Sequence, residues 1–409
     1  MIVLSGAHLV LANTIQSPGS LVLEGDRIAE ILPVARPDSD TARHVDLSNH
    51  YIVPGFIDAH VHGLAGFDAL HDHAGIGEMA AGLPSFGVTA FCPTTIACTP
   101  AALERFLTRV GDRRTASGRA GARVLPAHVE SGFINPEYRG AQPMQCLRRP
   151  PLESPATPVR TRRPIPAGED FDADDLLSVV AQAASDIGIV TLAPELDGAL
   201  ALIDRFIAAG HRVSLGHSAA TFEEGMAAIA RGARGATHLF NRMPPLHHRD
   251  PGLAGAVLAS DEVTAELVCD GHHVHPAVLR LAIAAKGRDR VMAVTDGTAG
   301  SALPVGAHTT LGGQPITVGQ TAAYLEDGTL AGSVLTMDRA FGLLVNEVGL
   351  SLPDAATMCS TTPARELGLR GLGVIAPGAT ADLAVLDRHL RVTRTFVGGR
   401  EVYRKGGEH

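Results

Sequence analysis

Cysteine is scarce in this chain of 409 residues, and its five cysteines form no recognisable motif. Their number is odd and no two have Cys-x-x-Cys spacing; they are Cys92, Cys98, Cys146, Cys269 and Cys359. A small secreted domain stabilised by disulfides carries a denser and usually even set. The pattern therefore indicates a protein of a reducing compartment, and we expect a cytoplasmic location.

Basic residues and long apolar runs are also lacking. The chain has 34 Lys and Arg against 43 Asp and Glu, a formal net charge of −9, whereas a general nucleic-acid binder needs a basic face. No apolar run is long enough to span a bilayer. The apolar start at residues 1–11 has no basic segment before it and is expected to be a strand, not a signal peptide. We therefore expect no nucleic-acid partner and no membrane partner.

What the chain has in abundance is apolar sequence, 45% of its residues, in which short strands alternate with helices. The predicted strands are Phe56–Val61, Val88–Pro93, Val124–Val129, Ile189–Leu192, Val213–Gly216, Ala236–Leu239, Ala265–Cys269 and Val291–Thr295. Amphipathic helices are predicted between them at Ala101–Val110, Asp174–Ala184, Leu196–Ala209, Phe222–Arg231 and Pro276–Lys286. This alternation predicts an α/β fold, a (β/α)₈ TIM-type barrel with its chemistry at the carboxyl ends of the strands.

The two ends of the chain have a different pattern. Strand-like runs occur at Met1–Leu4, His8–Leu11, Ser20–Glu24, Arg27–Leu32, Ala381–Leu386 and Arg394–Tyr403, the last broken at two glycines. We predict that these ends pair into a small β-sandwich domain of residues 1–53 plus 375–409. The barrel then occupies residues 54–374.

Polar side chains stand at the ends of several predicted barrel strands. His60 and His62 lie two residues apart on the first strand, so both point to the same face. The ends of the third, fifth, sixth and eighth strands add Glu130, His217, His238 and Asp296. Any one of these could be a hydrogen-bonded core residue, but six of them at one barrel mouth favour a metal site.

Imidazole and carboxylate donors without thiolate suit Zn²⁺, Fe²⁺, Mn²⁺ or Co²⁺. We expect one or two divalent ions, with zinc or iron favoured. Such an ion lowers the pKa of bound water from about 15.7 toward ~7 and polarises a carbonyl oxygen. Asp296, opposite the ligands of the first strand, is predicted to carry the proton.

With these residues, the chain resembles the amidohydrolase superfamily, and most closely its branch that deacetylates N-acetylated hexosamine phosphates. The similarity covers nearly the whole chain, with motifs at residues 54–58, 192–195, 216–218, 236–241, 251–255, 330–333 and 377–383. The resemblance implies metal-dependent hydrolysis of the N-acetyl group of N-acetylglucosamine 6-phosphate.

The resemblance also assigns roles at the metal site. It implies that Glu130, His217 and His238 hold the principal metal and that His60 and His62 help to form a second site. Many superfamily members bridge two metals with a carboxylated lysine, but the only lysines here are Lys286 and Lys405, away from the predicted strand ends. Any bridge is then expected to be Glu130, and Asp296 matches the proton-shuttling aspartate.

Positions for the sugar phosphate follow from the same resemblance. The expected substrate-binding residues are Ala141, Gln142, Asn241, Arg242, Arg249, His273, Leu330, Ala331 and Gly332. Arg249 is expected to reach into the site of a neighbouring subunit, which implies a homodimer. His273 is also expected to steady the oxyanion, as a catalytic residue beside Asp296.

Three departures from the family pattern surround the sugar pocket. Ser131-Gly132 follows Glu130 where the family usually has Gly-Pro, and Gln142 stands where it usually has histidine. The Pro- and Arg-rich segment Leu147–Asp170 is longer than usual and is either a solvated loop or a lid. Two alternatives therefore stay open: deacetylation of another N-acyl sugar, such as N-acetylgalactosamine 6-phosphate, and a non-catalytic scaffold.

Overall fold

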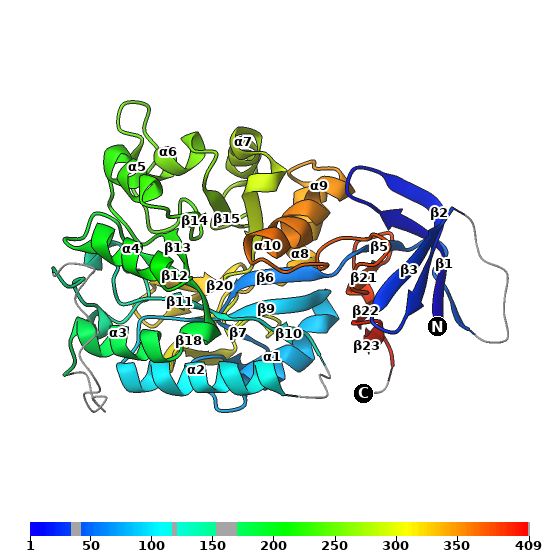
Figure 1. The fold of residues 1–409 in the computed structure, drawn as a ribbon, viewed down its shortest axis with the longest axis horizontal. Helices are drawn as coiled ribbons and strands as arrows, with labels where there is room; N and C mark the ends of the chain where they lie inside the picture. Colours follow the sequence, from blue (N-terminus) through cyan, green and yellow to red (C-terminus); the bar gives the residue numbers. More distant parts are fainter. Residues whose placement is uncertain (34–41, 117–120, 153–169, 408–409) are drawn as a thin grey trace.

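Eight parallel strands form the centre of the molecule (Figure 1). The computed structural model describes residues 1–33, 42–116, 121–152 and 170–407. The barrel strands are β6 (Phe56–Val61), β9 (Val88–Thr95), β11 (Ala127–Glu130), β12 (Ile187–Leu192), β13 (Arg212–Leu215), β14 (Gly235–Ala236), β15 (Thr264–Val268) and β16 (Val291–Val294). The last strand returns to the first where the N–H of Asp296 donates to the carbonyl of His60 at 2.9 Å. The predicted (β/α)₈ barrel is confirmed.

Most barrel strands differ from their predicted bounds by one or two residues, and the third and the sixth differ most. The third is divided into β10 (Arg123–Val124) and β11, and Pro126, which has no N–H to donate, lies in the gap. The sixth, β14, is only two residues long, because His238 and Phe240 have positive φ angles of 32° and 77° that end the extended backbone. The shortening of β14 lies at the carboxyl edge of the barrel, where His238 follows the strand.

Helices cover the outside of the barrel (Figure 1). They are α1 (Gly75–Gly82), α2 (Pro100–Thr115), α3 (Ala173–Gln182), α4 (Ala199–Ala208), α5 (Phe222–Ala230), α6 (Gly252–Ala259), α7 (Pro276–Lys286), α8 (Met337–Asn346), α9 (Leu352–Ala356) and α10 (Thr362–Glu366). Capping boxes begin α3 at Asp172 and α5 at Thr221, which satisfies N–H groups that have no partner within the helix. No described helix is both long and apolar enough to cross a membrane.

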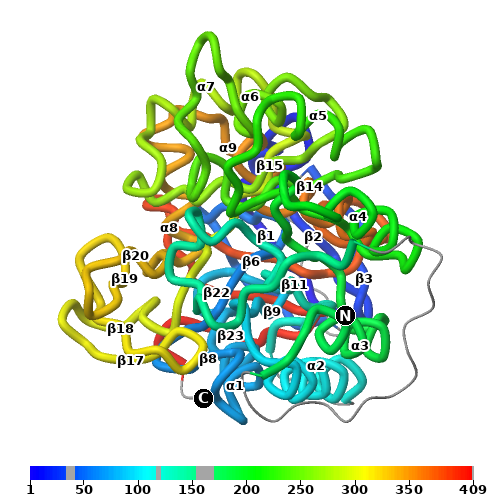
Figure 2. Tube along the Cα trace, turned by 90° about the vertical axis from the view of Figure 1, so that its left-hand side faces the viewer, coloured from blue at the N-terminus to red at the C-terminus, as the bar shows by residue number. Residues whose placement is uncertain are grey.

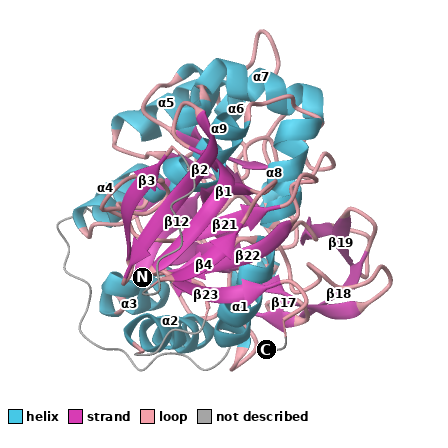
Figure 3. Ribbon diagram, turned by 90° about the vertical axis from the view of Figure 1, so that its right-hand side faces the viewer, coloured by secondary structure: helices cyan, strands magenta, loops and turns pink. Residues whose placement is uncertain are grey.

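The two ends of the chain share one sheet beside the barrel (Figures 1 and 3). Its strands are β1 (Ile2–Val10), β2 (Ile15–Glu24), β3 (Arg27–Leu32), β4 (Arg43–Asp46), β5 (Tyr51–Pro54), β21 (Leu383–Leu386), β22 (Val392–Val397) and β23 (Arg400–Arg404). Their order is β23-β22-β21-β5-β1-β2-β3, with β4 also beside β1. The sheet encloses a separate apolar core that includes Leu4, Leu23 and Phe396. The predicted small β domain built from both termini is confirmed.

A four-stranded antiparallel sheet that the sequence pattern does not predict follows β16. It consists of β17 (His308–Leu311), β18 (Gln314–Val318), β19 (Ala322–Leu325) and β20 (Leu330–Ser333), and it projects from one side of the barrel end (Figure 2). Its last strand returns to the barrel, where Ser333 pairs with Gly297. A smaller hairpin, β7 (Gly63–Leu64) with β8 (Phe67–Asp68), lies after the first barrel strand. The predicted loop or lid at Leu147–Asp170 lies largely outside the described residues, since only 147–152 and 170 are described.

Candidate metal centre

The polar residues predicted at the strand ends all lie at the carboxyl edge of the barrel. Glu130 is the last residue of β11, and His62 directly follows β6. His217, His238 and Asp296 each stand two residues beyond the end of their strand, with positive φ angles of 49°, 32° and 48°. Residues other than glycine rarely adopt this conformation, and such strain concentrates at functional sites.

Three of these side chains meet in a tight cluster. Oε1 of Glu130 lies 3.1 Å from Nε2 of His217 and 3.1 Å from Nε2 of His238. The two Nε2 atoms are themselves 3.0 Å apart. All three side chains are buried. The short distances show that their donor atoms face one another at one point.

A second cluster shares Glu130. Nε2 of His60 lies 3.2 Å from Nε2 of His62 and 3.8 Å from Oε1 of Glu130. Oδ1 of Asp296 is 3.2 Å from Nε2 of His62 and 3.6 Å from Nε2 of His60. The carboxylate of Asp296 therefore lies in contact with this cluster.

Neighbouring groups hold these side chains in place. Nδ1 of His217 is 2.9 Å from the carbonyl of Tyr138. Gln142 donates from Nε2 to Oε2 of Glu130 at 2.6 Å, while its Oε1 accepts from the N–H of Ala97 at 2.6 Å. Because Gln142 contacts Glu130, it supports a ligand of the cluster as well as lining the predicted substrate pocket.

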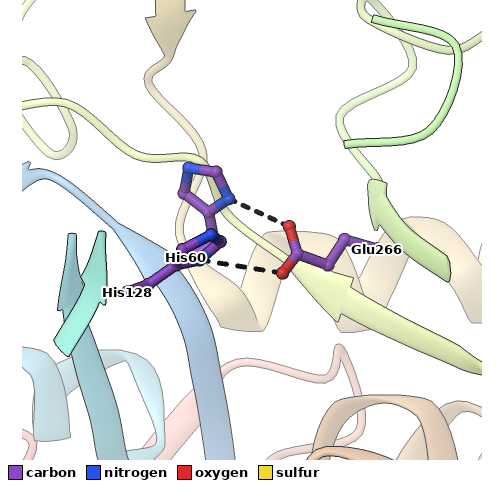
Figure 4. Close-up of side chains that lie close together, drawn as sticks. All are labelled: His60, His128 and Glu266. Atoms are coloured by element: carbon purple, nitrogen blue, oxygen red, sulfur yellow. Dashed lines mark hydrogen bonds and ion pairs between the residues drawn. The ribbon is translucent and has the colours of Figure 1, made fainter. Parts of the chain in front are cut away.

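Two buried residues of this network are not predicted from the sequence. Glu266 on β15 lies 3.0 Å from Nδ1 of His60 through Oε2, and its Oε1 lies 3.7 Å from Nδ1 of His128 on β11 (Figure 4). Each side chain stands between two apolar residues inside its strand rather than at the end of the strand. A charged residue in the middle of a buried strand is the signal that could have found Glu266.

The charges of the site follow from its burial and its neighbours. Burial acts to raise the pKa of the Glu130 carboxyl, but His217, His238 and His60 together lower it well below its ordinary value. Burial likewise opposes ionisation of Asp296, yet His60, His62 and His238 lower its pKa. Burial lowers the pKa of His128 to about 4, so this side chain is neutral. Both carboxylates of the clusters are ionised at neutral pH.

The donor atoms fit a divalent metal. Ligands at 2.0–2.1 Å from a tetrahedral ion lie roughly 3.3 Å apart. The contacts are 3.0–3.1 Å within Glu130–His217–His238 and 3.2–3.8 Å within His60–His62–Glu130, on either side of this value. Two groups could hold an ion in this way, Glu130–His217–His238 and His60–His62–Glu130. A third group, His60–His128–Glu266, also meets the spacing but its atoms are hydrogen-bonded to protein partners. The first two groups are therefore the candidate metal sites.

A pocket opens over the clusters. It is lined by His62, Ile96, Glu130, Ala141, Gln142, His217, His238, Asn241, Arg242, Asp296, Leu311, Leu330, Ala331 and Gly332. His60 lies beneath it with no exposed surface. The structure thus brings together all of the predicted ligands and seven of the nine predicted substrate-binding residues, at 141, 142, 241, 242 and 330–332.

Gly332 of β20 forms part of this pocket wall. Its φ is +130°, and a Cβ atom there would lie 2.9 Å from Cγ2 of Thr298 and 3.6 Å from Oδ1 of Asp296. Only glycine adopts this conformation readily and leaves room beside the carboxylate. Because Gly332 has no side chain, the backbone of β20 can lie directly beside Asp296.

Two predicted residues lie outside the lining of the pocket. Arg249 is exposed, and its Nη1 lies 2.8 Å from Nε2 of His248 on the same loop. His273 follows β15; its Nδ1 is 2.6 Å from Oδ2 of Asp270, and its buried Nε2 has no hydrogen-bond partner among the residues that the structure describes. The roles expected for these two residues stay predictions.

Comparison with known proteins agrees with this geometry. The sequence model of the amidohydrolase family matches residues 51–402. The N-acetylgalactosamine-6-phosphate deacetylase of Escherichia coli O157:H7 is 33% identical over 91% of this chain and 92% of the relative. The N-acetylglucosamine-6-phosphate deacetylase of Danio rerio is 36% identical over 88% of this chain and 86% of the relative.

Solved structures have the same fold. A mutant N-acetyl-D-glucosamine-6-phosphate deacetylase from Mycobacterium smegmatis, in complex with N-acetyl-D-glucosamine 6-phosphate, has a TM-score of 0.85 and 29% identity. The match covers 98% of this chain and 99% of that chain. With a family match over most of its length and relatives more than 30% identical, this chain belongs to the amidohydrolase family.

Proposed function

We propose that this protein hydrolyses the N-acetyl group of N-acetylglucosamine 6-phosphate, giving glucosamine 6-phosphate and acetate. The observation that carries the proposal is the convergence of four histidines, Glu130 and Asp296 beneath one pocket, in a chain whose relatives include deacetylases of this substrate. The complete set of polar groups favours an enzyme over a non-catalytic scaffold, since a scaffold needs none of them.

Asp296 is the proton carrier in this proposal. Water adds through its oxygen to the acetamide carbonyl carbon, and the Asp296 carboxylate accepts the proton that the water gives up. When the carbon–nitrogen bond breaks, the same carboxyl group returns the proton to the departing sugar amine. One carboxylate suffices because it lines the pocket and is ionised before the reaction.

The ligand clusters are proposed to hold one or two divalent ions, zinc or iron. When bound, such an ion polarises the amide carbonyl and lowers the pKa of water. Glu130, His217 and His238 hold the principal ion, and His60 and His62 share Glu130 for the second. Gln142 keeps Oε2 of Glu130 oriented, so that Oε1 stays between His217 and His238.

The sugar phosphate is proposed to lie along the pocket wall. Asn241 and Arg242 face the pocket, and an arginine can bind a phosphate through two parallel hydrogen bonds. Ala141 and β20 supply backbone and shape. Arg249, on an exposed loop, serves the site of a second subunit in a homodimer, and His273 donates to the phosphate or to the oxyanion. A cytoplasmic location stays a prediction.

A second substrate has a specific observation in its favour. One relative of comparable identity is an N-acetylgalactosamine-6-phosphate deacetylase. The two sugars differ only in the configuration at C4, and Ser131, Gly132 and Gln142 depart from the family pattern beside the pocket. N-acetylgalactosamine 6-phosphate is therefore the alternative substrate.

A direct comparison of substrates tests the proposal. Acetate release is measured with both N-acetylhexosamine 6-phosphates and with N-acetylglucosamine itself. The proposal expects the highest kcat/KM for N-acetylglucosamine 6-phosphate. A preference for the galactosamine compound selects the alternative, and no acetate release from any of them by the metal-loaded protein contradicts both.

A further inference from the structure

We propose that Glu266 is the positioning residue of the His60–His62 half of the metal site, and that it determines whether a second divalent ion binds. The inference rests on the proposed function, because it presupposes that the clusters hold metal. Glu266 lies on β15, its side chain is 1% exposed, and it does not line the substrate pocket.

The contact with His60 fixes one ring nitrogen. Oε2 of Glu266 lies 3.0 Å from Nδ1 of His60 (Figure 4). An ionised carboxylate only accepts hydrogen bonds, so Nδ1 carries the hydrogen. The other ring nitrogen, Nε2, is the one that faces His62, Glu130 and Asp296 at 3.2 to 3.8 Å. Glu266 therefore leaves the lone pair of Nε2 free for a metal, the arrangement that orients many histidine ligands.

His128 does not compete with His60 for this carboxylate. Its Nδ1 lies 3.2 Å from the carbonyl of Ala59, which can only accept, so Nδ1 donates there. Its Nε2 then accepts from the hydroxyl of Thr191 at 2.7 Å, and the chain continues through Thr237 at 2.7 Å to Ser214 at 2.6 Å. The distance from Nδ1 of His128 to Oε1 of Glu266 is 3.7 Å, beyond hydrogen-bond length.

Among the side chains of the candidate ligands, the carboxylate of Glu266 therefore contacts only that of His60 within hydrogen-bond distance. His60 is the only side chain hydrogen-bonded to Glu266 among the described residues, and the other contact is a long one from the N–H of His238 at 3.4 Å. Glu130 and His217 are held by Gln142 and by the carbonyl of Tyr138. Removing the charge of Glu266 should consequently weaken the His60–His62 centre and spare the Glu130–His217–His238 centre.

The experiment is a metal titration of the metal-free full-length protein with Zn²⁺ or Co²⁺ against a competing chelator. Wild type is expected to bind two equivalents. Glu266→Gln is expected to bind the first with unchanged affinity and the second about 10–100-fold more weakly, the usual loss when a partner of a metal-bound histidine is changed. Glu262→Gln is the matched control, because it makes the same change on an exposed side chain that pairs with Arg234.

A second variant tests whether the negative charge at position 266, rather than a general disturbance of the fold, determines binding of the second ion. Glu266→Asp keeps the carboxylate and is expected to bind the second ion more tightly than Glu266→Gln; it also serves if the Gln variant does not fold. Equal affinity for the second ion in wild type and Glu266→Gln overturns the inference. So does an equal loss at both equivalents, or a wild type that takes up a single ion. A wild type that binds no metal overturns the proposed function instead.

Discussion

Asp296 has a backbone that few residues other than glycine adopt and a buried carboxylate that lies within 3.2 Å of His62 and also lines the pocket. Such a group is either the proton carrier or a structural neighbour of the ligands. Asp296→Asn distinguishes the two, because the amide keeps the shape but cannot accept a proton. We expect kcat to fall at least ~10³-fold, with KM nearly unchanged and the principal metal retained.

Measurement of kcat, metal content and thermal melting on the same preparation completes this test. Asp175→Asn, which changes a buried carboxylate at the start of α3 that does not line the pocket, is the control and should keep its kcat. If Asp296→Asn retains most of its kcat, or loses activity only together with metal or fold, then Asp296 is structural.

His217 provides a test of the ligand assignment. Replacing it by alanine removes one of the three donors that meet at Glu130. We expect His217→Ala to lose most of the principal metal, as measured by elemental analysis of the purified protein. His211→Ala is the matched control, because His211 is also buried but is bonded to the carbonyl of Ile187 away from the clusters. Unchanged metal content in His217→Ala would remove that residue from the ligand set.

The sequence was sufficient to find these residues because of where they stand. His62, Glu130, His217, His238 and Asp296 each end or follow a short apolar run, and such runs in a parallel barrel deliver their ends to one edge. Glu266 and His128 could not be found in this way, because they lie inside strands whose neighbours are apolar. Their partners, His60 and Thr191, are known only once the barrel is closed.

At the scale of helices and strands, the apolar pattern of the sequence predicted those elements whose bounds depend on residues close together in the chain. The bounds of β3, β6 and α7 match the expected ranges because apolar periodicity and a clear start or end define them. β17 to β20 were missed because each is only four or five residues long and their burial follows no common pattern, from one buried residue of four in β17 to three of four in β20. The limits of the two domains, 1–53 plus 375–409 and 54–374, stay a prediction.

One ion pair joins the barrel to the terminal sheet. Arg123 on β10 donates from Nε and Nη2 to both carboxylate oxygens of Asp382, at 2.8 and 3.0 Å, directly before β21. Asp382 is 1% exposed and also accepts from the N–H of Gly398. Asp382→Ala leaves a partly buried guanidinium unpaired, so we expect a loss of about 3 kcal/mol in the free energy of unfolding.

Chemical denaturation measures this loss. The surface pair of Asp26 with Arg27, 3.6 Å apart and exposed, provides the control, and Asp26→Ala should change the stability by less than ~1 kcal/mol. Both variants should keep the wild-type kcat, since neither residue lines the pocket. Equal effects of the two substitutions would show that the buried pair does not stabilise the junction.

At the scale of the whole molecule, the ends of the chain meet although more than 320 residues separate β5 from β21, which pair antiparallel through Tyr51–Pro54 and Leu383–Leu386. Composition at the two ends was enough to predict that they meet, whereas the salt bridge that orients the sheet against the barrel depends on their final packing. Arg249 lies on an exposed loop outside the pocket of its own subunit, and the resemblance places it in the site of a neighbouring subunit.

Arg249 is expected to act on the phosphate of the substrate. Arg249→Ala removes a charge-assisted hydrogen bond of about 1.5–3 kcal/mol, so KM for the sugar phosphate should rise ~10–100-fold. Deacetylation of unphosphorylated N-acetylglucosamine should change little, because that substrate has no phosphate for Arg249 to bind. Steady-state kinetics on both substrates measures the difference, and equal losses on both would indicate a structural role for Arg249.

Mixed dimers test whether Arg249 acts in the site of its own subunit or in that of its partner. If each subunit lends Arg249 to its partner across a two-fold interface, a dimer of one Arg249→Ala and one Asp296→Asn subunit has one intact site. That site combines Asp296 of the first subunit with Arg249 of the second. Random exchange makes about half of the dimers mixed, so activity at low substrate concentration should recover to about a quarter of wild type. Mixing Arg242→Ala with Asp296→Asn is the control and should recover nothing, because Arg242 lines the pocket of its own subunit. If Arg249 acted within its own subunit, both mixtures would stay equally inactive.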